Sequence, residues 1–175
     1  MASQDHNAGE EQEQNLERHQ LIVFKLGQEE YGLHIDQIKE VVLTPHITRM
    51  PKTPFYIKGV ANIRGNIIAI VDLEEKFGLK ELSDKDINEA RHYTLVVESE
   101  TFKMGVLVEE VPNTLSVTSA EIDDSPNLMQ DNEDGGDYIS GIVKVKDRLI
   151  ILIDIFQVMA EKEVSQVLQK EKVVA

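Results

Sequence analysis

The segment Tyr56-Ile-Lys-Gly-Val-Ala-Asn-Ile-Arg-Gly-Asn-Ile-Ile-Ala-Ile-Val-Asp72 recurs later in the chain as Tyr138-Ile-Ser-Gly-Ile-Val-Lys-Val-Lys-Asp-Arg-Leu-Ile-Ile-Leu-Ile-Asp154. In both copies the opening Tyr-Ile, the Gly, a central Ile and the closing Asp coincide, and most other positions keep their apolar character. A repeat of this kind indicates two related structural units.

Each copy predicts a β-hairpin followed by a short capped helix. Short β-branched runs joined by turn residues are typical of hairpins, and the runs are Gly59–Ile63 with Ile67–Val71, and Gly141–Val145 with Leu149–Ile153. Asp72 and Asp154 each open a capping-box pattern, because Glu75 and Gln157 follow three residues later. Gly78 then ends the first helix.

A second strand pair precedes each hairpin. Leu21–Leu26 and Tyr31–Ile35 read as strands in the first half, and His92–Glu98 and Phe102–Val108 in the second. Tyr31-Gly-Leu-His-Ile35 matches Met104-Gly-Val-Leu-Val108 weakly. We also expect Asp36 to cap a short helical turn over Gln37–Glu40.

The pattern predicts a mainly β protein made of two small antiparallel barrels or sandwiches. The first half covers about 20–85, the second about 90–158, and the charged segment 80–91 links them. The two halves are expected to bury their apolar strands against each other. A terminal strand could cross over, so the source of each barrel's strands stays open.

Three segments fall outside this core. Residues 1–19 are rich in Gln, Glu and Asn and are predicted to be a disordered acidic tail. Residues 123–137 hold Pro, Asn, Gly-Gly and many acids, which favours a long mobile loop. Residues 155–172 carry apolar side chains at helical spacing, which predicts an amphipathic C-terminal helix.

Composition excludes several kinds of partner. The formal net charge is -14, so phosphate backbones and anionic membrane surfaces would repel the chain. The chain has no cysteine, which excludes disulfides and thiol chemistry. The longest apolar runs fall far short of the roughly 20 residues that a membrane span needs. We therefore expect a cytoplasmic protein that binds no nucleic acid and does not insert into a membrane.

A search for reaction chemistry finds little. Asp72 and Asp154, each ending an apolar strand of one repeat, suggest an aspartic-protease pair. That site needs a small hydroxyl residue and a Gly after the Asp, whereas Leu73 and Ile155 follow here, so helix caps are favoured. The five His residues lack metal-ligand spacing, and 131–137 lacks the order of a calcium loop. No metal, cofactor or enzymatic activity is expected.

Seven short segments between about Gln20 and Met159 form a recognisable set. They are Glu30-Tyr-Gly32, Ile35-x-x-Ile38-x-Glu40-Val41, Arg49-x-Pro51-x-x-Pro54, Gly59-Val-Ala-Asn-Ile-Arg-Gly65, Ile70-Val-Asp-Leu73, Tyr138-Ile-x-Gly141 and Leu152-Ile-Asp154. Together they resemble the chemotaxis coupling family, CheW-like adaptors, whose signature is a Gly-Val-x-Asn-Leu-Arg-Gly hairpin leading to Val-Asp-Leu.

The resemblance implies two five-stranded SH3-like barrels on a shared core and no catalysis. It implies two partners: the regulatory domain of a CheA-type histidine kinase and the cytoplasmic tip of a chemoreceptor (a methyl-accepting chemotaxis protein). The adaptor would couple receptor to kinase in arrays at the inner membrane. The alternative is a CheW-like scaffold in another receptor-kinase pathway, such as pilus motility.

Four protein-binding positions carry over from the resemblance. Arg64, in the hairpin turn, matches an Arg important for coupling; the alternative is a solvated turn residue. Glu40 matches an acidic residue implicated in receptor binding; the alternative is an exposed charge at a helix end. Ile38 matches an apolar contact, although its spacing from Ile35 equally suits core burial. Val111 is a second-half apolar candidate.

Overall fold

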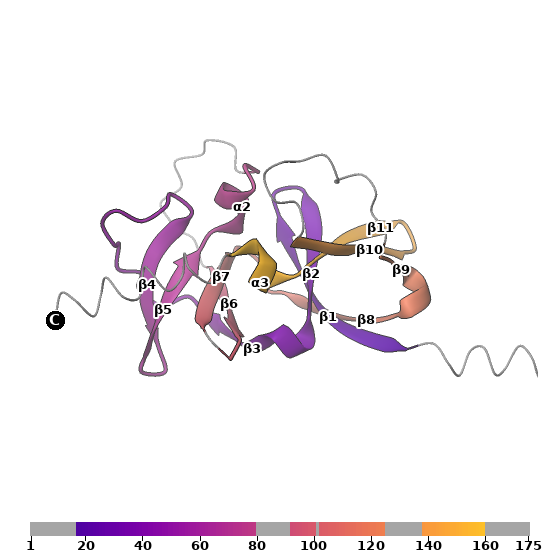
Figure 1. Cartoon of the computed structure of the whole chain (residues 1–175), viewed down its shortest axis with the longest axis horizontal. Coiled ribbons are helices and arrows are strands. Elements are labelled where there is room, and N and C mark those ends of the chain that lie inside the picture. The colour runs from indigo at the N-terminus through magenta and orange to yellow at the C-terminus, as the bar shows by residue number, and fades with distance from the viewer. Residues whose placement is uncertain (1–16, 80–91, 101, 125–137, 160–175) are drawn as a thin grey trace, which may run out of the picture.

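The computed structural model of the protein describes residues 17–79, 92–100, 102–124 and 138–159 (Figure 1). Short strands dominate these residues, with two four-residue α-helices and two 3-10 turns. In chain order the elements are β1 (Arg18–Leu26), β2 (Glu29–His34), η1 (Ile35–Gln37), β3 (Ile38–Leu43), β4 (Ile57–Ile63), β5 (Asn66–Val71), α2 (Leu73–Lys76), β6 (Tyr93–Glu98), β7 (Lys103–Val108), β8 (Asn113–Thr118), η2 (Ser119–Glu121), β9 (Ile122–Asp123), β10 (Ile139–Val145), β11 (Arg148–Ile153) and α3 (Ile155–Val158).

The strands form two sheets, and each sheet draws on both halves of the chain. Barrel A is the sheet β8-β1-β2-β11-β10-β9, and barrel B is the sheet β3-β6-β7-β5-β4. Barrel B has the predicted five strands; barrel A has a sixth, the two-residue β9. The pair β1–β2 lies beside the second hairpin, while β6–β7 lies beside the first (Figure 1). The element that crosses over is thus a whole strand pair in each half.

The exchange preserves the repeat. Tyr31 pairs in parallel with Ile151 in barrel A, and Met104 pairs in the same way with Ala69 in barrel B. These are the positions that the weak match between Tyr31–Ile35 and Met104–Val108 aligns. Each hairpin therefore meets a strand pair of the same kind, taken from the other half of the sequence.

Three apolar clusters hold this arrangement together. One fills barrel B and includes Ile63 and Ile70, and one fills barrel A and includes Val23 and Ile150. The largest combines side chains from both barrels, among them Leu33, Leu95, Val106 and Ile153. The two barrels therefore share a core, as predicted, and burial of this apolar surface is the main force that joins them.

The hairpins and caps predicted from the repeat are present. Arg64 and Gly65 connect β4 to β5 with positive φ angles of 51° and 83°, the backbone of a tight turn that suits twisted strands. Asp72 Oδ1 accepts a hydrogen bond from Glu75 N at 3.3 Å, and Asp154 Oδ1 accepts one from Phe156 N at 3.1 Å. Gly78, at φ 68°, ends the turn after α2.

Several element predictions were wrong. β1 begins at Arg18, so Arg18 and His19 belong to a strand rather than the tail, because they pair with Thr118 and Val117 of β8. Asp36 caps no helix: η1 follows His34, and the predicted helical turn at Gln37–Glu40 is mostly β3. The hydrogen bonds to β6 outweigh the local helical pattern there. The strand β8 was not predicted.

Other predictions lie wholly or partly outside the described residues. They concern the tail at 1–16, the linker at 80–91 and the loop at 125–137. The predicted C-terminal helix begins as α3 at Ile155, but α3 ends at Val158 because the buried Met159 takes extended backbone. The rest of that predicted helix falls in 160–175, outside the described part of the chain.

Candidate functional site

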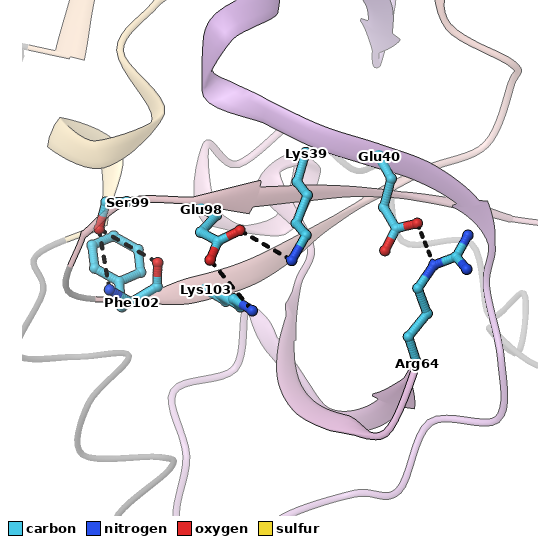
Figure 2. Close-up of polar contacts among 7 residues, drawn as sticks. All are labelled: Lys39, Glu40, Arg64, Glu98, Ser99, Phe102 and Lys103. Atoms are coloured by element: carbon cyan, nitrogen blue, oxygen red, sulfur yellow. Dashed lines mark hydrogen bonds and ion pairs between the residues drawn. The ribbon is translucent and has the colours of Figure 1, made fainter.

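Two of the predicted site residues meet in an ion pair. Arg64 Nε donates a hydrogen bond to Glu40 Oε2 at 2.6 Å, across the space between the β4–β5 turn and the edge strand β3 (Figure 2). The Arg64 side chain is 73% exposed, whereas the Glu40 side chain is only 19% exposed. An ion pair this open contributes at most about 1 kcal/mol to stability, because water screens it. The pair therefore leaves an exposed guanidinium attached to a half-buried carboxylate.

The local fold explains where each partner sits. Asn62 Oδ1 accepts a hydrogen bond from Gly65 N at 3.0 Å, which closes the turn and holds Arg64 at its tip. In β3 half-buried residues alternate with exposed ones, so Glu40 lies on the same face as Val42, which packs against the core of barrel B. Glu40 thus stands at the end of the barrel B core, and Arg64 covers it.

Ile38 begins β3 and is partly buried against the shared core. Packing accounts for part of its surface and the remainder faces solvent, so its role as a partner contact stays a prediction. A bulge at Lys39 separates Ile38 from Glu40 in the pairing with β6. This bulge turns Lys39 outward, where it meets Glu98.

A row of charges runs beside the pair. Glu98 of β6 lies 3.2 Å from Lys39 Nζ and 3.3 Å from Lys103 Nζ of β7 (Figure 2). The hydrogen bond from Lys39 holds the pKa of Glu98 below its usual range. Lys39, Glu98 and Lys103 thus form a polar border across one end of β3, β6 and β7.

The sequence reasoning missed two exposed apolar residues on β3. Val41 stands opposite Leu95, and Leu43 stands opposite Tyr93, so both lie on the face of barrel B that forms the shared core. They nevertheless remain 41% and 62% exposed. Their alternation with Glu40 and Val42 would have identified them, had the segment been read as a strand.

Val111 lies at the same end of barrel B. Leu43, Tyr93 and Val108 stand side by side across β3, β6 and β7. Val111 follows Val108 by three residues and is 59% exposed. The sequence alignment that matches Tyr31 to Met104 also matches Ile38 to Val111. The two apolar residues predicted to contact a partner protein are therefore equivalent positions of the repeat.

Barrel A lacks a counterpart of the ion pair. Lys146 occupies the turn position of Arg64, with a similar φ of 54°. Asn113 occupies the position of Glu40. Asn113 stands opposite Val23, Glu40 stands opposite Val96, and Val23 and Val96 are equivalent positions of the repeat. An amide in place of the carboxylate leaves Lys146 without that acidic partner. The fold is therefore built once with and once without the pair, which indicates that the barrel does not need it.

The rival chemistries receive no support from the described residues. Asp72 and Asp154 each accept a hydrogen bond from the start of their own helix, as N-caps do. Among residues 17–79, 92–100, 102–124 and 138–159, no cluster of three or more His, Asp or Glu side chains could hold a metal ion. In the same ranges, no helix is long and apolar enough to span a membrane.

Comparison with known proteins agrees with the resemblance in the sequence. The family model of the CheW-like domain matches residues 20–163. The chemotaxis protein CheW of Helicobacter pylori is 34% identical over 87% of this chain and 88% of its own, and that of Klebsiella aerogenes is 30% identical over 85% and 86%. The crystal structure of the scaffolding protein TtCheW from Thermoanaerobacter tengcongensis superposes with a TM-score of 0.67 at 31% identity, over 81% of this chain and 92% of that one. The chain belongs to the CheW-like family.

Proposed function

We propose that this protein is a non-enzymatic adaptor that couples chemoreceptors to a CheA-type histidine kinase. It would bind the regulatory domain of the kinase and the cytoplasmic tip of the receptor, and so act at receptor arrays on the cytoplasmic side of the inner membrane. Membership of a family of chemotaxis and scaffolding proteins supports this assignment.

The observation that carries the proposal is the Arg64–Glu40 pair. Arg64 is highly exposed, and its Nε donates a hydrogen bond to Glu40. A guanidinium has further N–H donors in the same plane, so Arg64 can bind a partner's carboxylate or carbonyl while it keeps Glu40. Arginine is also enriched among the residues that dominate binding energy. Because barrel A does without such a pair, a role in binding explains its presence better than a role in folding.

Exposed apolar residues on β3, on the face opposite Glu40, suit a helical partner. Val41 and Leu43 project from the shared-core face of β3, and Val111 lies at the same end of the sheet. An amphipathic helix docks by apolar anchors at intervals of three and four residues, within a polar rim. The row Lys39–Glu98–Lys103 adds polar groups at the other end of the same strands. The receptor tip would place its apolar anchors over Val41, Leu43 and Val111.

The experiment is isothermal titration of the protein into the regulatory domain of the kinase from the same organism, repeated with a receptor-tip fragment. The variants are Arg64→Glu, Glu40→Arg and the double charge swap. Arg64→Glu should weaken binding about 30-fold or more, which corresponds to roughly 2 kcal/mol. Lys146→Glu is the matched control, since it reverses a charge in the same turn of barrel A.

The double swap separates the two roles of Arg64. It restores an ion pair with reversed polarity, so a purely structural pair would regain wild-type affinity. Loss of binding in both Arg64→Glu and the swap, with normal circular dichroism, supports direct contact between Arg64 and the partner. Full recovery in the swap would show that the pair only shapes the hairpin. A folded wild-type protein that binds neither partner would refute the proposed coupling role.

A further inference from the structure

The helix α2 belongs to barrel B by sequence but packs on barrel A. It follows β5 directly, and Phe77 at its end lies between two tyrosine rings. The Tyr138 ring is 5.1 Å from Phe77, centroid to centroid, at an interplanar angle of 6°, and the Tyr31 ring is 5.9 Å away at 27°. Tyr31 is in β2 and Tyr138 precedes β10, so both rings come from barrel A. Stacked aromatic pairs add a directional attraction to the stabilisation that comes from the apolar area they bury.

A second contact also joins α2 to barrel A. Gly27 N, in the β1–β2 turn of barrel A, donates a hydrogen bond to Glu74 Oε1 at 3.1 Å. The backbone after α2 closes by a hydrogen bond from Leu79 N to Glu74 O at 2.8 Å. Leu79 Cβ then lies only 3.4 Å from the point where a Cβ on Gly27 would stand. The end of α2 is thus held against the turn by both polar and apolar contacts.

The opposite helix makes a reciprocal contact. α3 follows β11 of barrel A, and its Phe156 packs edge to face on Phe102 at 5.7 Å and 84°. Phe102 precedes β7 in the β6–β7 turn of barrel B. Asp154, the cap of α3, also accepts a hydrogen bond from Gln37 Nε2 at 3.3 Å, directly before β3. The helix that ends each hairpin is therefore attached to a turn of the other barrel.

We propose that Phe77 is a positioning residue, and that its stack between Tyr31 and Tyr138 sets the orientation of barrel B relative to barrel A. The shared core supplies most of the attraction between the barrels, but apolar contact has no preferred direction. The stack and the Glu74–Gly27 hydrogen bond do have preferred geometries. Removal of the ring should leave the barrels folded and joined while their mutual orientation becomes heterogeneous.

The test measures the distance between spin labels on the two barrels in the protein alone. The chain has no cysteine, so exposed Asn66 in β5 and Lys144 in β10 can be changed to Cys as single labelling sites on each barrel. Pulsed electron paramagnetic resonance then gives the distribution of distances between the two labels in the wild-type background, in Phe77→Leu and in Phe77→Tyr. The control is Phe55→Leu, because Phe55 is 71% exposed and packs edge to face on Tyr56 within barrel B.

We expect Phe77→Leu to broaden the distribution or add a second distance, and Phe77→Tyr to restore the narrow one, since it keeps a stacking ring. Phe55→Leu should match the wild-type background. An unchanged distance distribution in Phe77→Leu, even with a lower unfolding temperature, would overturn the proposal. Phe77 would then stabilise the fold by packing without setting the orientation of the barrels. Equal broadening in Phe55→Leu would overturn it as well, because the effect would not depend on the stack.

Discussion

Gly59 occupies a position where even one methyl group has no room. A Cβ built there lies 2.1 Å from Thr48 O and 2.8 Å from Thr48 C, both backbone atoms. The approach is close because Thr48 and Val60 exchange two backbone hydrogen bonds, of 2.8 and 2.9 Å, that hold the 44–56 segment across β4. Gly59 also has a φ of +146°, a region that side chains disfavour. Gly59→Ala must therefore either break this bridge or distort β4.

The cost of Gly59→Ala follows from these contacts. Separation of Thr48 from β4 loses two backbone hydrogen bonds, each contributing about 1 kcal/mol net. The backbone conformation adds about 1–3 kcal/mol of strain for a residue with a Cβ. The expected destabilisation is therefore about 3–5 kcal/mol, a large share of the roughly 5–15 kcal/mol that stabilises a typical domain.

Two glycines provide matched controls for a urea-unfolding measurement. Gly78→Ala has a φ of +68° but no atom within 4 Å of the new Cβ, so it should cost only about 1 kcal/mol of conformational strain. Gly141 is the repeat partner of Gly59; its new Cβ would lie 3.1 Å from Asp123 O, and we expect a smaller loss than at Gly59. A free energy of unfolding for Gly59→Ala equal to or above that of Gly78→Ala would refute the steric argument.

Three further predictions concern ionisable groups. Arg148 hydrogen bonds, at 2.7 and 3.0 Å, hold the pKa of Glu30 below its usual range. Because the pKa of Glu30 is lower in the folded than in the unfolded protein, the pair stabilises the fold at pH values above the unfolded pKa of about 4.3. The pair is exposed, so wild type should exceed Glu30→Gln by at most about 1 kcal/mol in unfolding free energy. Urea titrations should show this difference shrinking as the pH falls below about 4.3. Asp72→Asn should cost about 1 kcal/mol or less in unfolding free energy and abolish no activity, since the carboxylate caps a helix; loss of a hydrolytic activity would contradict this. Burial raises the pKa of Tyr31 above its usual value, so NMR should show its hydroxyl ionising at a higher pH than that of a free tyrosine. A titration at the usual pH would contradict the burial of this side chain.

The elements that sequence reasoning predicted well are those with local causes. The hairpin at Arg64-Gly65 follows from β-branched runs and a turn that needs positive φ, and the helix starts follow from Asp72 and Asp154. Each of these signals lies within a few residues of the structure it specifies. The repeat reinforces these signals because the same residues occur twice at matching positions.

The features that it missed depend on distant partners. Gln37–Glu40 reads as a helical turn in isolation, but Ile38–Glu40 belongs to a strand because β6 offers hydrogen bonds. Likewise, β8 has few apolar residues of its own and forms by pairing with β1. The exchange of strand pairs leaves no local trace, since either hairpin could accept either pair. The contact between Arg64 and Glu40 was missed for the same reason, although both residues were predicted as separate sites.

The repeat also gives a way to separate folding from function at the candidate site. Two barrels built on one pattern face the same structural demands, so a residue needed for the fold should recur in both. Asp72 and Asp154 recur as helix caps, and Gly59 and Gly141 recur at the start of the hairpins. Arg64 and Glu40 do not recur as a pair, because barrel A has Lys146 and Asn113 in their places. What one barrel has and its equivalent lacks is not required by the shared fold, and an exposed guanidinium on the β4–β5 turn, together with exposed apolar residues on β3, indicates a partner protein.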